Sequence, residues 1–384
     1  MRVGLGVYAE APSGLAVATV DTALALERTG VDVTLFADGT ARLPDRAARL
    51  SRPVVRLEPL PALMRRPLVA DGLFLPTKLA VARRWRRSVD ASLDVAHSFS
   101  PGFAALLPRS LPVTVQAWFH PPRIRQRLAT MLAFAPRGPH YPAHVLLELQ
   151  SHASDLLGYR RASLVVANTE TAKNALRAAG YRAECVPPCV VVLPEPPARE
   201  RSAAFRITFC AHPLARPRKG LVHLLAALEQ VRHRPLQLTL VGGGADEVRS
   251  GLDSLRRQGI DVVETGRIAR DAYLEELALR TDLLAFPSLY EEWGYALLEA
   301  LSQGVPVLAF DLYPFFEIVD GDTGVLVPAG DPGAMAAAID AAAGGRLPDP
   351  AAVLRSTRER FGAESVAQRL LGVLEMATGA GTRT

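Results

Sequence analysis

The sequence predicts an α/β protein made of two doubly wound domains, and three observations support this fold class. Short apolar runs alternate with helical patterns in both halves of the chain, which is the order expected of parallel sheets covered by helices. The chain has 384 residues, which is too long for one typical core and fits two domains. A proline-rich and charged stretch over residues 193–202 has the composition of a linker between them.

The composition is that of a globular protein, with 49% hydrophobic and 22% charged residues. Three cysteines in no zinc or redox spacing indicate a reducing compartment. The N-terminus carries one basic residue and too short an apolar run for a signal peptide, and no stretch approaches the roughly 20 apolar residues of a membrane span. We therefore expect a cytoplasmic protein. Its net charge of +5 suits anionic ligands, and we expect no nucleic-acid partner.

The first half opens with a strand, a loop, a helix and a second strand. Residues 2–8 form an apolar run, the loop that follows contains Gly14, residues 15–28 are helical and residues 31–36 form the next strand. This order is the start of a doubly wound sheet. The nicotinamide fingerprint Gly-x-Gly-x-x-Gly is absent. A tight turn and a close approach to a ligand explain Gly14 equally well.

Two basic stretches interrupt the first half. One is the helix-like run over residues 79–87, in which Trp85 lies among arginines, and the other covers residues 123–127. Such runs are most often a solvated face. A second interpretation is contact with an anionic acceptor or a lipid surface, because tryptophan beside arginine suits a membrane interface. A peripheral contact with the inner face of the membrane therefore stays open.

Histidines end two predicted strands of the first half. His97 closes the strand at residues 93–99, and His120 closes the strand at residues 112–120. Because the carboxyl ends of parallel strands line the ligand crevice, either histidine can reach it. No group of His, Cys or Asp has metal-ligand spacing, so we expect no metal. A strand over residues 163–168 and a helix to about residue 179 follow.

The second half opens with a strand over residues 206–211, and its loop carries Arg216, Arg218 and Lys219 before Gly220. Cations between a strand and a helix are well placed to meet a diphosphate. Arg218 is the preferred partner of Lys219, with Arg216 in reserve, and a solvated charge run is the alternative. Further strands are predicted over residues 238–244 and 261–268.

The most informative stretch covers residues 282–310, which read as strand, loop, helix and strand. Glu291 lies in the loop before the helix, and Glu299 lies about one turn inside it. Free backbone amides at the helix start, near Gly294 and Tyr295, suit a phosphate. Carboxylates beside a phosphate can accept hydrogen bonds from sugar hydroxyls. The alternative is that each glutamate only complements the helix dipole.

Glu291 and Glu299 resemble the Glu-x7-Glu signature of retaining glycosyltransferases of family 4 (group 1), which have the GT-B fold. This family usually has Glu-Gly-Phe-Gly where this chain has Glu291, Glu292, Trp293 and Gly294. The resemblance covers nearly the whole chain and is most specific over residues 206–330. It implies two Rossmann-like domains that face a cleft.

The resemblance also implies a role for individual residues. Glu291, Glu292 and Trp293 would bind the donor sugar, and Glu299 would bind the ribose. The remaining implied contacts are with the donor diphosphate, through Gly14, Arg218, Lys219, Gly294 and Tyr295. Glu291, Lys219 and His120 are the implied catalytic residues, although His120 lies about two residues later than in the family.

The implied activity is retaining transfer of a sugar from a nucleotide-diphosphate sugar, without metal or other cofactor. The acceptor would be a glycan, a lipid-linked group or a small molecule. Two alternatives stay open: an epimerase or hydrolase of nucleotide sugars, and a non-catalytic sugar-binding relative. The predicted layout is an acceptor-side domain over residues 1–195, a linker over 196–203 and a nucleotide-sugar domain over 204–360. Residues 361–384 form a last helix, for which crossing back onto the first domain is open.

Overall fold

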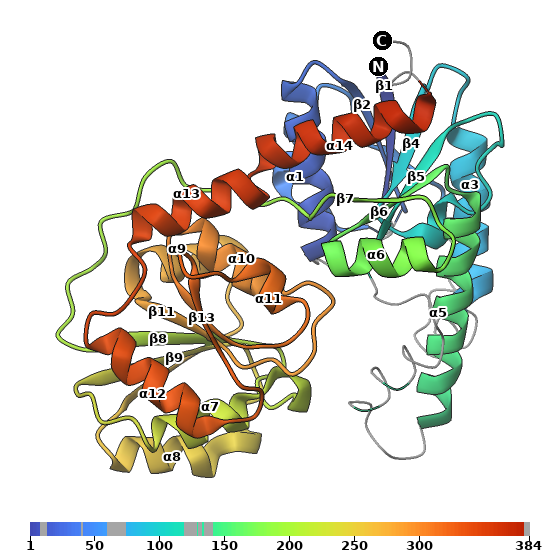
Figure 1. The fold of residues 1–384 in the computed structure, drawn as a ribbon. Coiled ribbons are helices and arrows are strands. Elements are labelled where there is room, and N and C mark those ends of the chain that lie inside the picture. The colour runs from blue at the N-terminus through green and yellow to red at the C-terminus, as the bar shows by residue number, and fades with distance from the viewer. Residues whose placement is uncertain are drawn as a thin grey trace. The chain divides into compact units, whose positions relative to one another are not determined.

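The computed structural model describes residues 1–7, 14–39, 41–59, 74–118, 129, 133 and 141–379. The chain divides into two compact units (Figure 1). Unit 1 comprises Met1–Cys189 together with Ala363–Thr384, and unit 2 comprises Val190–Gly362. The last helix therefore belongs to the unit that contains the N-terminus. His120 and residues 123–127 lie outside the described residues.

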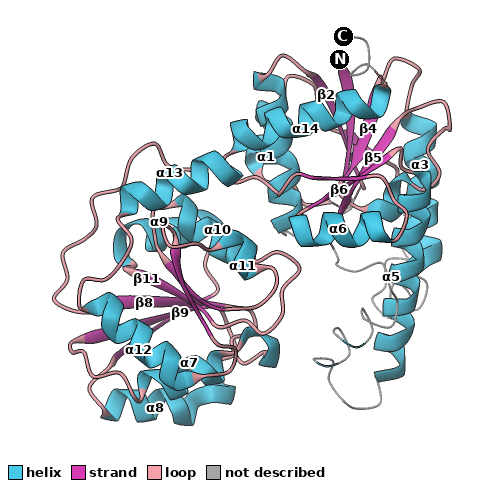
Figure 2. Cartoon of the chain, viewed as in Figure 1, coloured by secondary structure: helices cyan, strands magenta, loops and turns pink. Residues whose placement is uncertain are grey.

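Unit 1 is built on a parallel sheet of seven strands (Figure 2). The strands are β1 (Arg2–Val7), β2 (Asp32–Ala37), β3 (Val55–Arg56), β4 (Val95–Ser98), β5 (Val113–Ala117), β6 (Leu164–Ala167) and β7 (Ala183–Cys185). Their order is β3-β2-β1-β4-β5-β6-β7, so β1 lies between β2 and β4. The chain winds in opposite directions from that point, which makes the sheet doubly wound.

Helices cover both faces of this sheet. They are α1 (Gly14–Arg28), α3 (Phe74–Ser88), α5 (Tyr141–Arg161), α6 (Glu170–Ala178) and α14 (Ala363–Thr378). Helix α14, at the red end of the chain, lies beside α1 at the blue end (Figure 1). Its buried face includes Val366, Leu370 and Leu374, which join the core of α1, β1 and β4. This burial fixes the C-terminal helix to unit 1.

Unit 2 has a parallel sheet of six strands in the order β10-β9-β8-β11-β12-β13. The strands are β8 (Phe205–Cys210), β9 (Leu236–Val241), β10 (Asp261–Gly266), β11 (Leu283–Phe286), β12 (Val307–Phe310) and β13 (Gly324–Val327). All four residues of β11 and of β12 are buried, as expected for strands covered on both faces. Strand β8 lies between β9 and β11, so the winding direction changes there.

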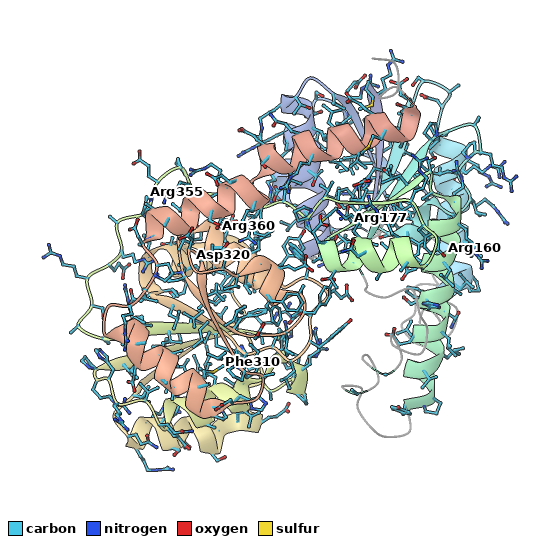
Figure 3. All side chains as sticks on the ribbon, viewed as in Figure 1. Arg160, Arg177, Phe310, Asp320, Arg355 and Arg360 are labelled. Carbon is cyan, nitrogen blue, oxygen red and sulfur yellow. The ribbon has the colours of Figure 1, made fainter. Side chains whose placement is uncertain are left out.

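The helices of unit 2 follow its strands in alternation. They are α7 (Leu221–Leu228), α8 (Arg249–Arg257), α9 (Arg270–Arg280), α10 (Tyr295–Ser302), α11 (Phe315–Ile318), α12 (Pro332–Ala343) and α13 (Pro350–Phe361). Arg360 of α13 pairs with Asp320 and donates to the carbonyl oxygen of Glu317 (Figure 3). These contacts hold the segment after α11 against α13.

Gly362 separates the last helix, which the sequence predicts over residues 361–384, from the helix before it. Helix α13 ends at Phe361 and α14 begins at Ala363, because Gly362 has an extended backbone with ψ of 141°. A side chain at Gly362 would overlap the carbonyl oxygen of Arg358. The chain passes from unit 2 back to unit 1 at this glycine.

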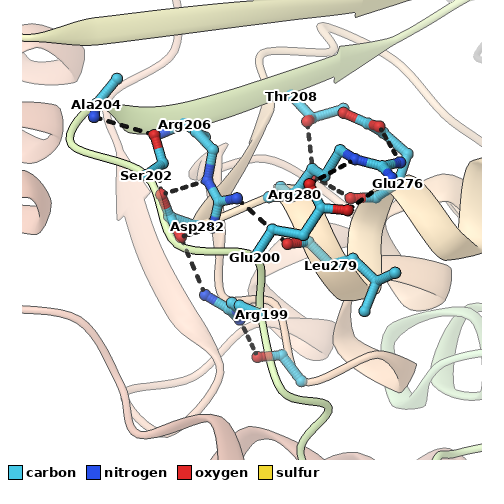
Figure 4. Close-up of polar contacts among 12 residues, drawn as sticks. Arg199, Glu200, Ser202, Ala204, Arg206, Thr208, Glu276, Leu279, Arg280 and Asp282 are labelled. Carbon is cyan, nitrogen blue, oxygen red and sulfur yellow. Dashed lines mark hydrogen bonds and ion pairs between the residues drawn. The ribbon is translucent and has the colours of Figure 1, made fainter.

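The predicted linker, residues 196–203, lies against unit 2 (Figure 4). Arg199 pairs with Asp282 at 3.5 Å and donates to the carbonyl oxygen of Gly304. The N–H of Glu200 donates to the carbonyl oxygen of Leu279. Earlier in the segment, the N–H of Val190 donates to the carbonyl oxygen of Phe361. These bonds explain why the division between the units falls at residues 189 and 190, before the stretch with linker composition.

Candidate active site

The residues predicted to bind the sugar donor lie on two loops of unit 2. These loops follow β8 and β11, the neighbouring strands at which the winding direction of the sheet changes. Residues 211–220 follow β8, and residues 287–294 follow β11. In an open parallel sheet, ligands bind at the carboxyl ends of the strands where the winding direction changes. Sheet order therefore brings together Lys219 and Glu291, which are 72 residues apart in the chain.

Gly220 allows the first loop to approach the second. Its φ is +71°, in the left-handed region, and a Cβ atom would overlap the carbonyl oxygen of Pro287. The N–H of Leu289 donates to the carbonyl oxygen of Arg218 at 2.8 Å. The loops are thus joined through backbone, and the side chains of Arg218 and Lys219 are directed to the same carboxylate.

Glu291 is the centre of a half-buried charge cluster. Lys219 Nζ forms an ion pair with its Oε1, and an Arg218 terminal nitrogen lies 3.1 Å from its Oε2. Ser288 donates its hydroxyl to the Oε1 at 3.1 Å. The side chains of Lys219, Arg218 and Glu291 are only 16%, 26% and 10% exposed. Two positive charges and one negative charge leave this cluster net positive, which suits an anionic ligand.

Helix α10 begins directly after this cluster. Its N-cap residue is Gly294, whose φ of +92° strains any other residue and which has no side chain to cap the first turn. Phe286 and Phe315 enclose Gly294, and Lys219 Nζ lies 5.7 Å from the ring centre of Phe286. The helix start therefore directs its positive dipole end toward the loop of Glu291.

Glu299 lies one turn inside α10 and pairs with a residue that the sequence did not indicate. Arg270, the first residue of α9, donates its Nε–H to Glu299 Oε1 at 2.7 Å. Burial and then the charge of Glu299 raise the pKa of the nearby Cys210 thiol to about 11. Among the described residues, Glu291 thus lies between Lys219 and Arg218, whereas Glu299 pairs with Arg270.

Two family models match the chain, one for each unit. The group 1 glycosyl transferases match residues 204–343, and the glycosyl transferase 4-like domain matches residues 13–194. The first match contains every residue of the charge cluster and both glutamates. The chain belongs to the group 1 glycosyltransferases.

A known relative agrees with this membership, and solved structures share the fold. The phosphatidyl-myo-inositol mannosyltransferase of Mycobacterium leprae is 38% identical over 130 residues, which is 32% of this chain and 33% of that protein. The match thus spans about one third of the length of that curated relative. Sucrose-phosphate synthase from Thermosynechococcus elongatus superposes with a TM-score of 0.69 at 17% identity, covering 99% of this chain and 100% of that one.

A second solved structure is the Anabaena protein HepE in complex with UDP and glucose. It superposes with a TM-score of 0.67 at 19% identity and covers 98% of this chain and 100% of that one. At such identities the likeness concerns the fold alone. The fold of this glycosyltransferase is GT-B, with two Rossmann-like domains.

The loop before α10 places the side chains of Glu292 and Trp293 differently. Glu292 is exposed, whereas Trp293 is 3% exposed and packs against Phe361 with ring centres 5.9 Å apart. The Trp293 ring therefore packs within unit 2, and the predicted contact of this residue with the donor sugar stays a prediction. Tyr295 is half-buried at the start of α10.

His97 is fully buried in β4 of the glycosyltransferase. Its Nδ1 lies 2.8 Å from the Thr114 hydroxyl, and Phe99 packs against the ring. Burial lowers the pKa of His97 to about 3, although the Gln116 side chain opposes the shift. The imidazole is neutral and enclosed, so His97 does not present a side chain to a ligand. Gly14 is the first residue of α1 and is partly buried.

The tryptophan of the basic helix α3 is a core residue, which corrects the membrane-interface interpretation of Trp85. Its side chain is 0% exposed and stacks on Phe103 with ring centres 4.5 Å apart. Thr77, Val81 and Trp85 recur every four residues, so they form one buried stripe. Arg86 and Arg87 are exposed on the same helix.

Metal-ligand clusters and membrane-spanning helices are both absent from the described part of the chain. No group of three or more His, Cys, Asp or Glu residues within the described ranges could hold a metal ion. None of the helices seen there is long and apolar enough to cross a bilayer.

The sequence identified Arg218, Lys219, Glu291 and Glu299 but missed three neighbours. Ser288, Phe286 and Arg270 each contact one of these residues. Ser288 and Phe286 could have been found from their position at the end of β11. Arg270 carried no such signal, because its contact depends on the packing of α9 beside α10.

Proposed function

We propose that this glycosyltransferase moves a sugar from a nucleotide-diphosphate sugar to an acceptor hydroxyl, with retention of the anomeric configuration. The observation that best supports this is the convergence of Arg218, Lys219 and Glu291 at the winding change of the unit 2 sheet. A diphosphate is a leaving group that needs positive charge, and a sugar has hydroxyls that a carboxylate can bind.

In the proposed reaction, the bond between the anomeric carbon and the diphosphate oxygen breaks while the acceptor oxygen bonds to the same carbon. The departing phosphate oxygen takes the acceptor proton. Lys219 and Arg218 stabilise the negative charge that develops on the leaving group. Glu291 holds the donor sugar, the amides near Gly294 bind phosphate oxygens, and Glu299 binds the ribose hydroxyls.

The proposed reaction needs no metal, because the two cations supply the positive charge that a metal would bring. Activity should therefore survive EDTA. Complete loss on chelation, with recovery on adding magnesium or manganese, would overturn the metal-free proposal.

A lipid-linked acceptor is one form of the proposal, beside a glycan or a small molecule. The relative from Mycobacterium leprae is named a phosphatidyl-myo-inositol mannosyltransferase. In unit 1, helices α3 and α5 pack together, and α3 exposes Arg86 and Arg87. Helix α5 exposes Leu146 and Leu149. Exposed arginines and exposed leucines are both features of surfaces that bind anionic lipids.

A thermal-shift screen with UDP, GDP, ADP and dTDP tests the donor class. A ligand present at 100 times its Kd stabilises the folded protein by about 2.7 kcal/mol, so the matching nucleotide should raise the Tm. No shift with any nucleotide would overturn the proposal.

Product analysis without acceptor then separates sugar transfer from the two alternative activities, since an epimerase or hydrolase consumes the nucleotide sugar when no acceptor is present. A non-catalytic relative would bind it without consuming it.

A further inference from the structure

Ser288 lies in the loop that follows β11, and its hydroxyl contacts the central carboxylate of the charge cluster. The hydroxyl donates to Glu291 Oε1 at 3.1 Å, and Ser288 is only 1% exposed. The same oxygen is paired with Lys219, whereas Arg218 lies beside Oε2. The carboxylate of Glu291 thus has one neutral donor from its own loop and two cations from the loop after β8.

The backbone is held on both sides of Ser288. The carbonyl oxygen of Pro287 lies against Gly220, where a Cβ atom would come within 1.9 Å of it. On the other side, the N–H of Leu289 donates to the carbonyl oxygen of Arg218 at 2.8 Å. Serine also has a short side chain with little rotamer freedom to lose, unlike lysine and arginine. The hydroxyl of Ser288 is therefore a donor that is already in place before any ligand binds.

The two cations have other acceptors to serve. In the proposed reaction, Lys219 and Arg218 stabilise the charge of the leaving diphosphate. One terminal nitrogen of Arg218 already divides its contacts between the carbonyl oxygen of Tyr290 and Glu291 Oε2, each at 3.1 Å. A diphosphate carries more negative charge than one carboxylate, so it draws both cations away from Glu291. The neutral hydroxyl of Ser288 is left as the donor that holds Oε1.

We propose that Ser288 is a positioning residue that keeps Glu291 oriented for the donor sugar once Lys219 and Arg218 bind the diphosphate. A hydrogen bond to one carboxylate oxygen fixes the rotation of the group, and the second oxygen can then accept from a sugar hydroxyl. Without Ser288, the carboxylate would lose its orientation when the cations turn to the diphosphate. This inference rests on the proposed function, because it assumes that the donor sugar reaches Glu291.

The test compares the affinity for a nucleoside diphosphate with the affinity for a nucleotide sugar that contains it. UDP, GDP, UDP-glucose, UDP-galactose and GDP-mannose are titrated by calorimetry, and the nucleotide sugar that binds most tightly is paired with its own diphosphate. Ser288→Ala should weaken binding of the nucleotide sugar about 10-fold, because a bond to a charged group is lost. The Kd of the diphosphate should stay within about threefold of wild type, because Lys219 and Arg218 are unchanged.

Two further variants separate the hydrogen bond from packing. Ser288→Cys has nearly the size of wild type, but its S–H is a weak donor, so it should lose affinity for the nucleotide sugar as Ser288→Ala does. In a Glu291→Ala background, Ser288→Ala should change this affinity by less than about threefold, because the hydroxyl has no carboxylate to hold. If Ser288→Ala does not fold, Ser288→Cys gives the same readout.

The matched control is Thr208→Val in the neighbouring strand β8. Thr208 is buried, and its hydroxyl lies 2.7 Å from the hydroxyl of Thr281 (Figure 4). Valine keeps the shape of this side chain and removes a buried hydrogen bond that does not involve Glu291. This variant should lower the Tm and leave both affinities at their wild-type values.

The outcomes separate this inference from the function beneath it. Binding of the nucleotide sugar that is unchanged in Ser288→Ala, or unchanged in Ser288→Cys, overturns the inference alone. An equal loss of affinity for the diphosphate also overturns it, since Ser288 would then be merely structural, and so does a full further loss in the Glu291→Ala background. A wild-type protein that binds none of the five ligands overturns the inference together with the proposed function.

Discussion

Replacing Glu291 by glutamine should change the affinity for a nucleoside diphosphate and the turnover of a nucleotide sugar in opposite directions. In this structure Glu291 is the anionic partner of Lys219 and Arg218. A diphosphate that binds the same cations has to compete with this carboxylate. The glutamine variant has the same shape but no charge, so the competitor is weakened while the cations stay in place.

The magnitude follows from the geometry of the cluster. At 3.1 Å, the distance between Arg218 and Glu291, two unit charges attract by about 5 kcal/mol at an effective dielectric constant of 20. Desolvation offsets most of this, and a charge-assisted bond contributes about 1.5–3 kcal/mol against about 1 kcal/mol for a neutral one. We expect a gain of about 1–2 kcal/mol, which lowers the Kd of the nucleoside diphosphate roughly 5- to 30-fold.

Turnover should fall because glutamine is a weaker acceptor for the hydroxyls of the donor sugar. We expect a loss of kcat/KM of about 100-fold, similar to the loss of one electrostatic contact in other active sites. Calorimetry with UDP or GDP and initial rates with the matching nucleotide sugar measure the two effects. Glu264→Gln is the control, because Glu264 also bridges two arginines, Arg249 and Arg256. If Glu291→Gln binds the nucleotide no more tightly than wild type, the competition argument is wrong.

Three further predictions address other parts of the molecule. Lys219→Ala should cost about 2–4 kcal/mol in kcat/KM with little change in Tm, since its contacts are with the loop of Glu291; near-normal kcat/KM would refute its role. The pKa of His97 falls from 6.5 to about 3 on folding, so between these pH values the unfolded chain binds the extra proton. Stability should then decrease as the pH falls through this window, by up to about 1.4 kcal/mol per pH unit, and His97→Gln should flatten this slope in urea melts at pH 7 to 5. Replacing Arg84, Arg86 and Arg87 by serine should leave nucleotide affinity unchanged and raise the KM of an anionic or lipid-bound acceptor. If this variant has the same kinetics as wild type, and the wild-type rate does not depend on salt, these arginines form only a solvated face.

The doubly wound fold was predictable because many of its strands and helices have a local sequence signal, although β3, β7 and α5 were not predicted. Buried parallel strands are short apolar runs, and the helices between them begin and end at recognisable positions. Strand β11 and helix α10 were expected, in this order, within residues 282–310, and they lie at Leu283–Phe286 and Tyr295–Ser302. The family resemblance of Glu291 and Glu299 depends on this same local spacing, and the family models match this part of the chain.

Burial of single aromatic residues was less visible in the sequence. Trp85 lies among arginines, and Trp293 lies between a glutamate and a glycine, so their neighbours suggested exposed positions. The helical period of Thr77, Val81 and Trp85 would have shown the buried stripe of α3. No period exists in the loop before α10, and only its packing against Phe361 shows that Trp293 is buried.

The sequence by itself determined the strand and helix order, the glutamate motif and the cationic loop, because these depend on residues close together in the chain. Tertiary structure decided the partners. It selected Arg218 over the exposed Arg216, and it joined Glu299 to Arg270. The physical reason is that sheet order and helix packing bring together residues that are 29 to 73 positions apart, and local propensity carries no information about such pairs.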